Sequence, residues 1–322
     1  MASPMDVRSA LKEGMARLRA ANVASSTLAA ELLLMHATGH DRAWIYAHPE
    51  AALGLAEGKK LFELVARRAA GEPTQYLTGK QEFWGLDFDV TPAVLIPRPE
   101  TEHVIEVALE RLGEQRGIKI NMRTGAPSPV LRIADVGTGS GCIAVALANE
   151  LPHAEIFATD ISEDALQVAR RNAERHGAAD RVHFVRTDLL QELSDRMGAS
   201  DNDAQLFDLI VSNPPYVARS EADELPREVR EHEPAAALFG GPTGIELYER
   251  LIEQAAALLD RRGILVLELG YNCADSVRAM LSRKGVWASV SLTNDLAGIP
   301  RVIAAERVGD SKGISGGSRP PG

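Results

Sequence analysis

The chain has 322 residues, of which 45% are hydrophobic and 25% are charged, and its formal net charge is −10. This length predicts about two domains, and the apolar content is enough for a sizeable core. The acidic balance favours a protein partner over nucleic acid, because proteins that bind nucleic acid usually carry a basic patch that neutralises its phosphates. No run approaches the roughly 20 apolar residues that span a membrane, no signal peptide is visible, and neither cysteines nor histidines have metal-site spacing, so we expect a cytoplasmic protein with no metal.

The first segment, residues 1–74, is predicted to be a helical domain. Apolar side chains recur at steps of three and four residues, as in Val7, Leu11, Met15 and Leu18, and glycines and prolines interrupt the pattern. The segment contains no catalytic constellation. We therefore expect its apolar stripes to form a core.

Residues 75–97 have a different pattern, typical of short strands around turns. Phe83, Phe88 and Val90 belong to this pattern, which predicts a β-hairpin linker between two domains. Pro97 and Pro99 exclude a helix until about position 101. A helix is then expected to start near there, close to Glu100, and to run to about Leu112.

From residue 130 the pattern alternates between strand and helix. Strand-like runs lie at 130–136, 154–159, 181–186, 206–212, 263–269, 286–292 and 301–307. Helical runs lie at 141–150, 163–176, 244–259 and 273–284. This alternation predicts an α/β fold with a mostly parallel sheet covered on both faces. Residues 113–129 and 191–205 are expected to be polar insertions, and residues 309–322 a disordered tail.

A glycine-rich loop joins the first of these strands to the first of these helices. Its candidate ligand-binding residues are Gly137, Thr138, Gly139, Ser140 and Gly141. Glycines let a nucleotide approach the backbone, next to a helix N-terminus. Asp160 ends the following strand, where a carboxylate can bind both hydroxyls of a ribose. A dinucleotide enzyme would place an acid at a similar distance, so these features do not distinguish NAD from another adenosine cofactor.

The most specific motif is Asn213-Pro214-Pro215-Tyr216, which follows the strand-like run at 206–212. The side-chain oxygen of Asn213 and the carbonyl of Pro214 both accept hydrogen bonds. Two consecutive prolines make a stiff wall without donors, and the ring of Tyr216 offers a flat face. Together these groups predict a site for an NH2 group on a planar system, such as an amide or an exocyclic amine.

These motifs together resemble class I S-adenosylmethionine-dependent methyltransferases that act on a planar nitrogen. Further segments narrow the resemblance to the peptide chain release factor N5-glutamine methyltransferases, the PrmC/HemK family. Those segments are residues 71–79, 82–86, 95–102, 233–238, 240–244, 268–270 and 295–301. The resemblance extends to about Arg307. The motif at 213–216 is shared with adenine methyltransferases, whereas the segment at 96–102 is much more specific to this family.

The resemblance implies a fold, a cofactor and a substrate. It implies a methyltransferase domain over residues 98–308, with seven strands of which the last is antiparallel, and substrate recognition by the helical domain. The substrate would be the glutamine in the Gly-Gly-Gln motif of class 1 release factors, methylated on N5 by S-adenosyl-L-methionine. No direct nucleic-acid partner and no membrane partner are expected.

Several residue roles also come from the resemblance. The glycine loop would hold S-adenosylmethionine, with Asp160 at the ribose, Asp188 and Leu189 beside the adenine, and Asn213 next to the cofactor. Arg98 and Glu100 would lie on the substrate side, although a linker ion pair explains them equally well. The catalytic residues would be Asn213, Pro214, Pro215 and Tyr216.

Three alternatives stay open at this point. An adenine-N6 methyltransferase of DNA or RNA would share the NH2 site, but it would need the basic patches and would lack the specific linker motif. A non-catalytic cofactor-binding scaffold would not need NH2 acceptors. An NAD enzyme would use the same glycine loop.

Overall fold

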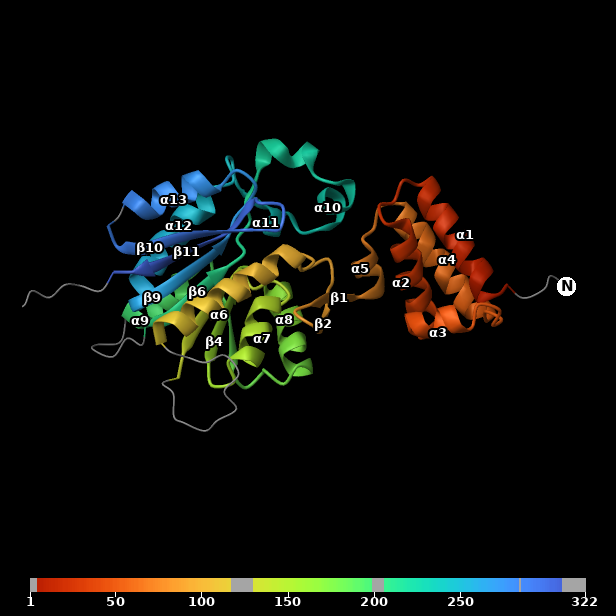
Figure 1. The fold of residues 1–322 in the computed structure, drawn as a ribbon, viewed down its shortest axis with the longest axis horizontal. Helices are drawn as coiled ribbons and strands as arrows, with labels where there is room; N and C mark the ends of the chain where they lie inside the picture. Colours follow the sequence, from red (N-terminus) through yellow and green to blue (C-terminus); the bar gives the residue numbers. More distant parts are fainter. Residues whose placement is uncertain (1–4, 117–129, 199–205, 284, 309–322) are drawn as a thin grey trace, which may run out of the picture.

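The computed structural model describes residues 5–116, 130–198, 206–283 and 285–308. It shows an elongated molecule with a helical region at one end and a larger α/β body at the other (Figure 1). The predicted loop beyond residue 116, the insertion beyond residue 198 and the predicted tail lie outside the described residues.

Over its described residues, the helical region contains five helices and has a core of its own. These are α1 (Val7–Ala20), α2 (Ser26–Thr38), α3 (Arg42–Ala47), α4 (Leu55–Ala69) and α5 (Thr74–Thr78). The side chains of Asp6 and Asp41 accept backbone hydrogen bonds at the starts of α1 and α3, which satisfies donors that a helix leaves free. Leu18, Leu33 and Leu61 are buried together between the helices. The helices extend beyond residue 74, because α5 occupies the start of the segment predicted to be a hairpin.

The hairpin is shorter than predicted and packs into the larger body. Strands β1 (Lys80–Phe83) and β2 (Leu86–Asp89) pair antiparallel. Phe83 and Phe88 are buried in the same core as the sheet. The side chain of Asn172 accepts from the Asp89 amide at 2.7 Å and donates to the Ser140 carbonyl at 2.8 Å. This buried amide therefore ties the hairpin to the glycine loop.

The larger body is built on a seven-stranded sheet with the order β10-β11-β9-β6-β3-β4-β5. The strands are β3 (Arg132–Val136), β4 (Glu155–Asp160), β5 (Val182–Arg186), β6 (Phe207–Ser212), β9 (Leu259–Glu268), β10 (Trp287–Asn294) and β11 (Pro300–Arg307). The pairs among β5, β4, β3, β6 and β9 are parallel, and β11 is antiparallel to β9 and β10. All six residues of β6 are buried, as expected for a strand covered on both faces. The predicted mostly parallel sheet, with its last strand antiparallel, is confirmed.

Helices cover both faces of this sheet (Figure 1). One face packs against α6 (Glu102–Arg116), α7 (Cys142–Glu150) and α8 (Glu163–Arg175). The other packs against α9 (Gln191–Gly198), α12 (Glu246–Leu258) and α13 (Ala274–Arg283). The helix α9 is a difference from the predicted polar insertion, and it forms because Leu193 is buried against the second core.

An excursion between β6 and α12 leaves the sheet and turns toward the helical region. It contains β7 (Val217–Ala218), the 3-10 helix η2 (Arg219–Glu224), α10 (Arg227–His232), α11 (Ala235–Leu238) and β8 (Phe239–Gly241). The short strands β7 and β8 pair in parallel. Arg68 of α4 forms an ion pair with Glu228 of α10. The excursion therefore connects the 213–216 motif to the helical region.

Candidate functional site

A cavity of about 370 Å³ lies at the carboxyl ends of β3, β4 and β6. This is where open α/β sheets bind their ligands. The predicted site residues that line it are Arg98, Gly137, Thr138, Gly139, Ser140, Asp160, Asp188, Leu189, Asn213 and Pro215. The predicted residues that do not line it are Glu100, Gly141, Pro214 and Tyr216. The structure thus brings together ten predicted residues from widely separated parts of the chain.

The three glycines of the loop have two different environments. Gly137 and Gly139 have φ of +72° and +55°, and a Cβ on either would meet no atom closer than 4.0 Å. Their backbones are therefore open to a ligand. A Cβ on Gly141 would lie 3.0 Å from the Cβ of Ala169. Gly141 allows α7 to approach α8, so its contribution to the site is the close packing of these helices.

Asp160 holds the glycine loop and the next helix at the same time. Its Oδ2 accepts from the Gly139 amide at 3.0 Å, and its Oδ1 accepts from the Ser162 amide at 2.9 Å. An ionised carboxylate offers about four acceptor positions, so Asp160 can still accept from a ribose. Burial raises the pKa of Asp160 above its usual value. Ser162 itself caps α8 by accepting from the Ala165 amide.

The cavity wall fits a ligand with polar groups. The hydroxyls of Ser140 and Thr159 are buried and have no hydrogen-bond partner within the described residues, and both residues line the cavity. A buried hydroxyl without a partner is costly, so a ligand with polar groups suits this wall. Leu189 has a φ of +54°, an unusual value for leucine of the kind often found at functional sites. Asp188 next to it pairs with Arg250 at 2.6 Å.

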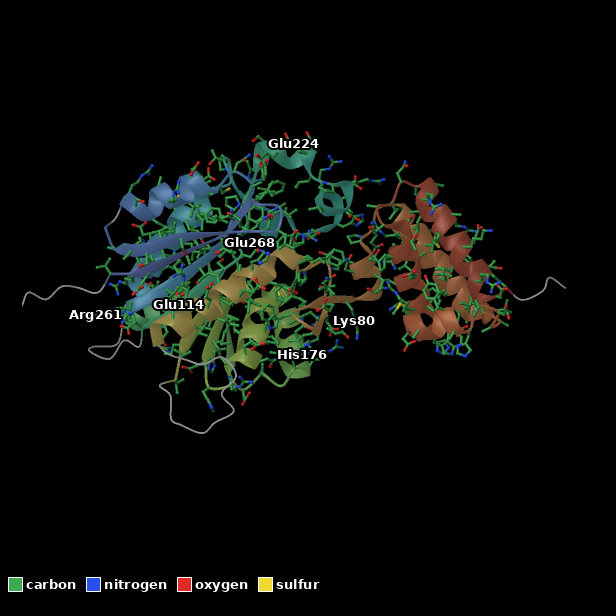
Figure 2. All side chains as sticks on the ribbon, viewed as in Figure 1. Lys80, Glu114, His176, Glu224, Arg261 and Glu268 are labelled. Atoms are coloured by element: carbon green, nitrogen blue, oxygen red, sulfur yellow. The ribbon has the colours of Figure 1, made fainter. Side chains whose placement is uncertain are left out.

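Asn213 lines the cavity at the end of β6, and its side-chain nitrogen is bound by Thr101. Its Nδ2 donates to the Thr101 hydroxyl at 3.0 Å, and that hydroxyl donates to Glu268 Oε2 at 2.7 Å. Glu268 is the last residue of β9, and Figure 2 shows it near the middle of the larger body. Burial raises the pKa of Glu268 to about 7.

The loop that follows Asn213 is fixed by close backbone contacts. A Cβ on Gly240 would lie 2.4 Å from the Pro215 carbonyl oxygen, and one on Gly244 would lie 2.3 Å from that of Tyr216. The Tyr216 ring lies against Gly270, where a Cβ would come within 2.7 Å of the ring. Only glycine fits at these three positions, so the glycine-containing segments of the chain clamp the loop.

Arg98 both lines the cavity and forms an ion pair. It donates to Glu233 Oε1 at 2.5 Å, and the other oxygen of Glu233 accepts from the Ile96 amide. The carboxylate of Glu233 is almost fully buried, so the pair fixes the linker against the excursion. Glu100 is exposed.

Thr101, Glu233 and Glu268 were not predicted as functional residues. They stand in the segments 95–102, 233–238 and 268–270, which the sequence singles out without assigning them roles. Thr101 and Glu268 are 167 positions apart, so no local pattern indicates that they meet.

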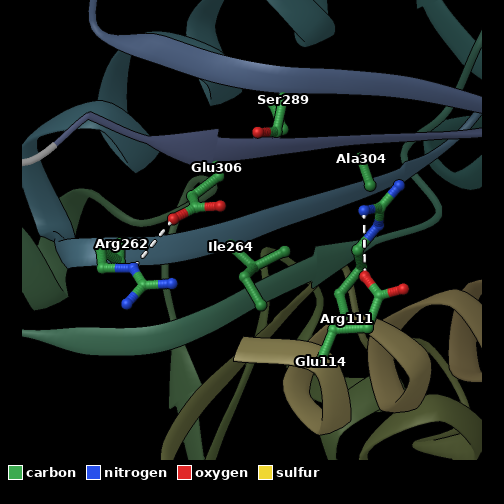
Figure 3. A pocket seen from close by; sticks show the side chains of 8 residues that line it. Arg111, Glu114, Arg262, Ile264, Ser289, Ala304 and Glu306 are labelled. Atoms are coloured by element: carbon green, nitrogen blue, oxygen red, sulfur yellow. Dashed lines mark hydrogen bonds and ion pairs between the residues drawn. The ribbon is translucent and has the colours of Figure 1, made fainter. Parts of the chain in front are cut away.

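A second cavity, of about 260 Å³, lies elsewhere in the larger body (Figure 3). Its charged lining residues pair with one another, Arg262 with Glu306 at 3.2 Å and Arg111 with Glu114 at 3.2 Å. Figure 2 shows Glu114 well away from Glu268, toward the end of the body that carries the start of β9. None of the predicted site residues lines this cavity.

Within the described ranges, no three or more His, Cys, Asp or Glu side chains are grouped so that they could hold a metal ion. No helix in these ranges is both long and apolar enough to cross a membrane.

Two family models match the sequence. The PrmC N-terminal domain matches residues 9–79, and the Methyltransferase small domain matches residues 123–229. The first covers the helical region and the second covers the glycine loop and the 213–216 motif.

Curated relatives match almost the whole chain. A release factor glutamine methyltransferase of Koribacter versatilis is 42% identical over 304 residues, which cover 94% of this chain and 99% of the relative. One of Nitratidesulfovibrio vulgaris is 42% identical over 298 residues, covering 92% and 94%. Among solved structures, the hMettl16 catalytic domain in complex with a MAT2A 3'UTR hairpin has a TM-score of 0.53 at 20% identity, covering 77% of this chain and 83% of that chain. That structure shows a shared fold.

Proposed function

Since the chain belongs to the release factor glutamine methyltransferase family, we propose that its 370 Å³ cavity holds the cofactor and that Asn213 holds the substrate amide. The enzyme methylates a glutamine side-chain amide of release factors and uses S-adenosyl-L-methionine as the methyl donor. We assign the substrate glutamine to the Gly-Gly-Gln motif of class 1 factors. The observation that carries the site assignment is the position of Asn213, which lines the same cavity as Gly137, Gly139 and Asp160.

The cofactor would supply an electrophilic methyl group on a sulfonium, whose bond to the methyl group breaks on transfer and leaves a neutral thioether. The backbones of Gly137 and Gly139 would leave room for the cofactor, and Asp160 would accept from its ribose while it keeps the loop in place. Asp188 and Leu189, which also line the cavity, would lie beside the adenine. Gly141 contributes by bringing α7 close to α8.

The substrate nitrogen is a poor nucleophile because it shares its lone pair with the amide carbonyl. The Asn213 side-chain oxygen and the Pro214 carbonyl accept its two hydrogens and direct the lone pair toward the methyl group. Both acceptors also stabilise the positive charge that develops on nitrogen during transfer. The nitrogen becomes acidic only after it has gained the methyl group, so its proton then leaves to solvent. Pro215 stiffens the loop, and Tyr216 supports it through its contact with Gly270.

We propose that the helical region recognises the release factor outside the methylated loop. It has its own core, supplies no residue to the cavity and contacts the excursion that follows Tyr216. The net charge of −10 suits a protein partner with basic character better than nucleic acid or an anionic membrane. We place the enzyme in the cytoplasm, where release factors act in translation.

The proposed function is tested by labelled methyl transfer. Purified protein is incubated with methyl-labelled S-adenosylmethionine and a class 1 release factor, and the modified residue is mapped by mass spectrometry. One added methyl on the glutamine of the Gly-Gly-Gln motif is expected. A factor with alanine in place of that glutamine is the control. Label in DNA or RNA with the factor untouched would instead favour the adenine methyltransferase alternative, whose NH2 site is chemically similar.

A further inference from the structure

Two consecutive hydrogen bonds lead away from the cavity behind Asn213. Asn213 Nδ2 donates to Thr101 Oγ1, and Thr101 Oγ1 donates to Glu268 Oε2. Thr101 and Glu268 are each 2% exposed, so solvent does not compete for the bond between them. Thr101 lines the cavity, and Glu268 does not. The three residues therefore form a short series that leads from the half-buried Asn213 to a buried carboxylate.

The direction of these bonds follows from the number of protons. A hydroxyl has a single proton, and an ionised carboxylate can only accept. The proton of Thr101 therefore goes to Glu268, which leaves only lone pairs for Asn213. Of the two ends of the Asn213 amide, only the nitrogen can donate to those lone pairs. The oxygen is then the end that remains for a ligand in the cavity.

We propose that Thr101 and Glu268 are positioning residues that set the orientation of the Asn213 amide, so that its oxygen accepts from the substrate nitrogen. This inference rests on the substrate role proposed above for Asn213. With the amide reversed, its NH2 group would face the NH2 group of the glutamine, and two donors cannot bond to each other. Thr101 and Glu268 would thus act through Asn213 without touching the substrate.

The protonation of Glu268 supplies an independent signature. A neutral Glu268 can donate to Thr101, which then can donate to the Asn213 oxygen and favour the reversed amide. Burial raises the pKa of Glu268 to about 7, with Glu100 acting in the same direction and Thr101, Arg301 and Arg98 opposing it. The other titratable groups that interact with it are Cys142, Tyr216 and Tyr248. We therefore expect kcat to rise with pH through this ionisation.

The first test compares Thr101→Val with Thr101→Ser. Valine keeps the shape but removes the hydroxyl, whereas serine keeps the hydroxyl. With the whole release factor as substrate, we expect Thr101→Val to lower kcat about tenfold or more. This loss should be smaller than the roughly 10²–10³-fold fall in kcat that follows removal of a group in direct contact with the reacting atoms. KM for the factor should stay within about twofold. Thr101 lines the cavity, but valine fills a similar volume and the single hydroxyl proton goes to Glu268, so the calorimetric Kd for S-adenosylmethionine should rise far less than kcat falls. Thr101→Ser should restore kcat.

The second test is the pH profile of Glu268→Gln. A glutamine can either accept from or donate to Thr101 and does not titrate, so we expect a lower kcat that no longer rises near pH 7. This variant decides the matter if Thr101→Val does not fold. A profile that still rises as in the unmodified enzyme would overturn the inference.

Other outcomes separate this inference from the proposed function. Normal kcat in Thr101→Val, or equal losses in Thr101→Val and Thr101→Ser, would show that the hydroxyl does not orient the amide. A loss of cofactor affinity as large as the loss of kcat would indicate a structural role and overturn the inference too.

Asn213→Ala is measured in parallel. If Asn213→Ala is inactive and Thr101→Val is normal, only the positioning role fails, whereas an active Asn213→Ala would remove the substrate role of Asn213 itself.

Discussion

Single residues in this site perform more than one task, and Asp160 shows this most clearly. Its two oxygens accept from the Gly139 and Ser162 amides, and the residue also lines the cavity. The sequence predicts Asp160 and the glycine loop because strand, loop and helix are adjacent in the chain. Ser162, whose amide Asp160 binds, in turn caps α8.

Replacing Asp160 by alanine should weaken cofactor binding. Each hydrogen bond to a charged group contributes about 1.5–3 kcal/mol, so loss of one ribose bond corresponds to roughly a tenfold or greater increase in Kd. Isothermal calorimetry with S-adenosylmethionine measures this change. Asp164→Ala, at an exposed position of α8, is the matched control and should bind normally. Unchanged affinity in Asp160→Ala would remove the ribose assignment.

Gly139 and Gly141 should respond differently to valine. A side chain at Gly139 projects into open space, so Gly139→Val should fold but bind the cofactor poorly. At Gly141 a Cβ would lie 3.0 Å from Ala169 Cβ and 3.2 Å from its Cα, so Gly141→Val should push α7 from α8. Both positions have positive φ, so backbone strain is common to the two variants. We expect the larger fall in Tm at Gly141, and equal falls would contradict the distinction.

Asp135 should make stability depend on pH. Burial raises its pKa from the usual 3.8 to about 7, and the hydrogen bonds from Thr138 and Ala144 only partly oppose this. A raised pKa means that its contribution to stability is present below about pH 4 and is lost as the pH rises through 7. One unit corresponds to about 1.4 kcal/mol, so the loss is of the order of 4 kcal/mol.

Denaturant unfolding at several pH values measures the Asp135 effect. Asp135→Asn cannot ionise, and its unfolding free energy should fall less between pH 4 and pH 7 than that of the unmodified protein. Glu268 also has a raised pKa and contributes to both curves, so the difference between the two isolates Asp135. Parallel curves would show that Asp135 does not titrate in this range.

At the scale of elements, the excursion between β6 and α12 controls the shape of the loop that follows Asn213. Gly240 and Gly244 lie against the carbonyls of Pro215 and Tyr216, and Glu233 forms an ion pair with Arg98.

The sequence predicts the strands of the sheet and the helices that cover it well, because each is long, apolar and periodic. It does not predict α9, α10 and α11, because these helices are short and depend on tertiary contacts such as the burial of Leu193 and Leu238.

Gly244→Ala should impair methyl transfer through the loop. Its Cβ would lie 2.3 Å from the Tyr216 carbonyl oxygen and 3.0 Å from the Ala218 amide, so the loop must shift. A displacement of about 1 Å at the reacting groups costs roughly 10²-fold in rate. Cofactor affinity should change far less, because Gly244 does not line the cavity. Gly177→Ala has a similar positive φ and no neighbour within 4 Å, so it controls for backbone strain and should keep near-normal kcat.

At the scale of the whole molecule, side chains of α4 and α5 join two packed bodies. The helical region and the sheet have separate cores. Tyr76 and Arg68 connect them, Tyr76 by donating to the Val94 carbonyl at 2.6 Å and Arg68 by its ion pair with Glu228. The sequence predicts two domains from length and from the change of pattern near residue 75. It cannot predict the Arg68–Glu228 pair, whose members lie 160 positions apart.

A truncated chain that begins at Pro73 should separate chemistry from recognition. It keeps Tyr76, which packs with Val90 and Val94 beside the cofactor cavity, and it loses α1 to α4. We expect its Kd for S-adenosylmethionine to stay within about tenfold of that of the full chain, because none of the residues of α1 to α4 lines the cavity. Methylation of the whole release factor should fall steeply.

A short peptide with the Gly-Gly-Gln sequence should be an equally poor substrate for the truncated and the full chain, because it has nothing for the helical region to bind. Full activity of the truncated chain on the whole factor would show that recognition resides in the sheet body alone, whereas loss of activity on the peptide as well would show that the helices support the site itself.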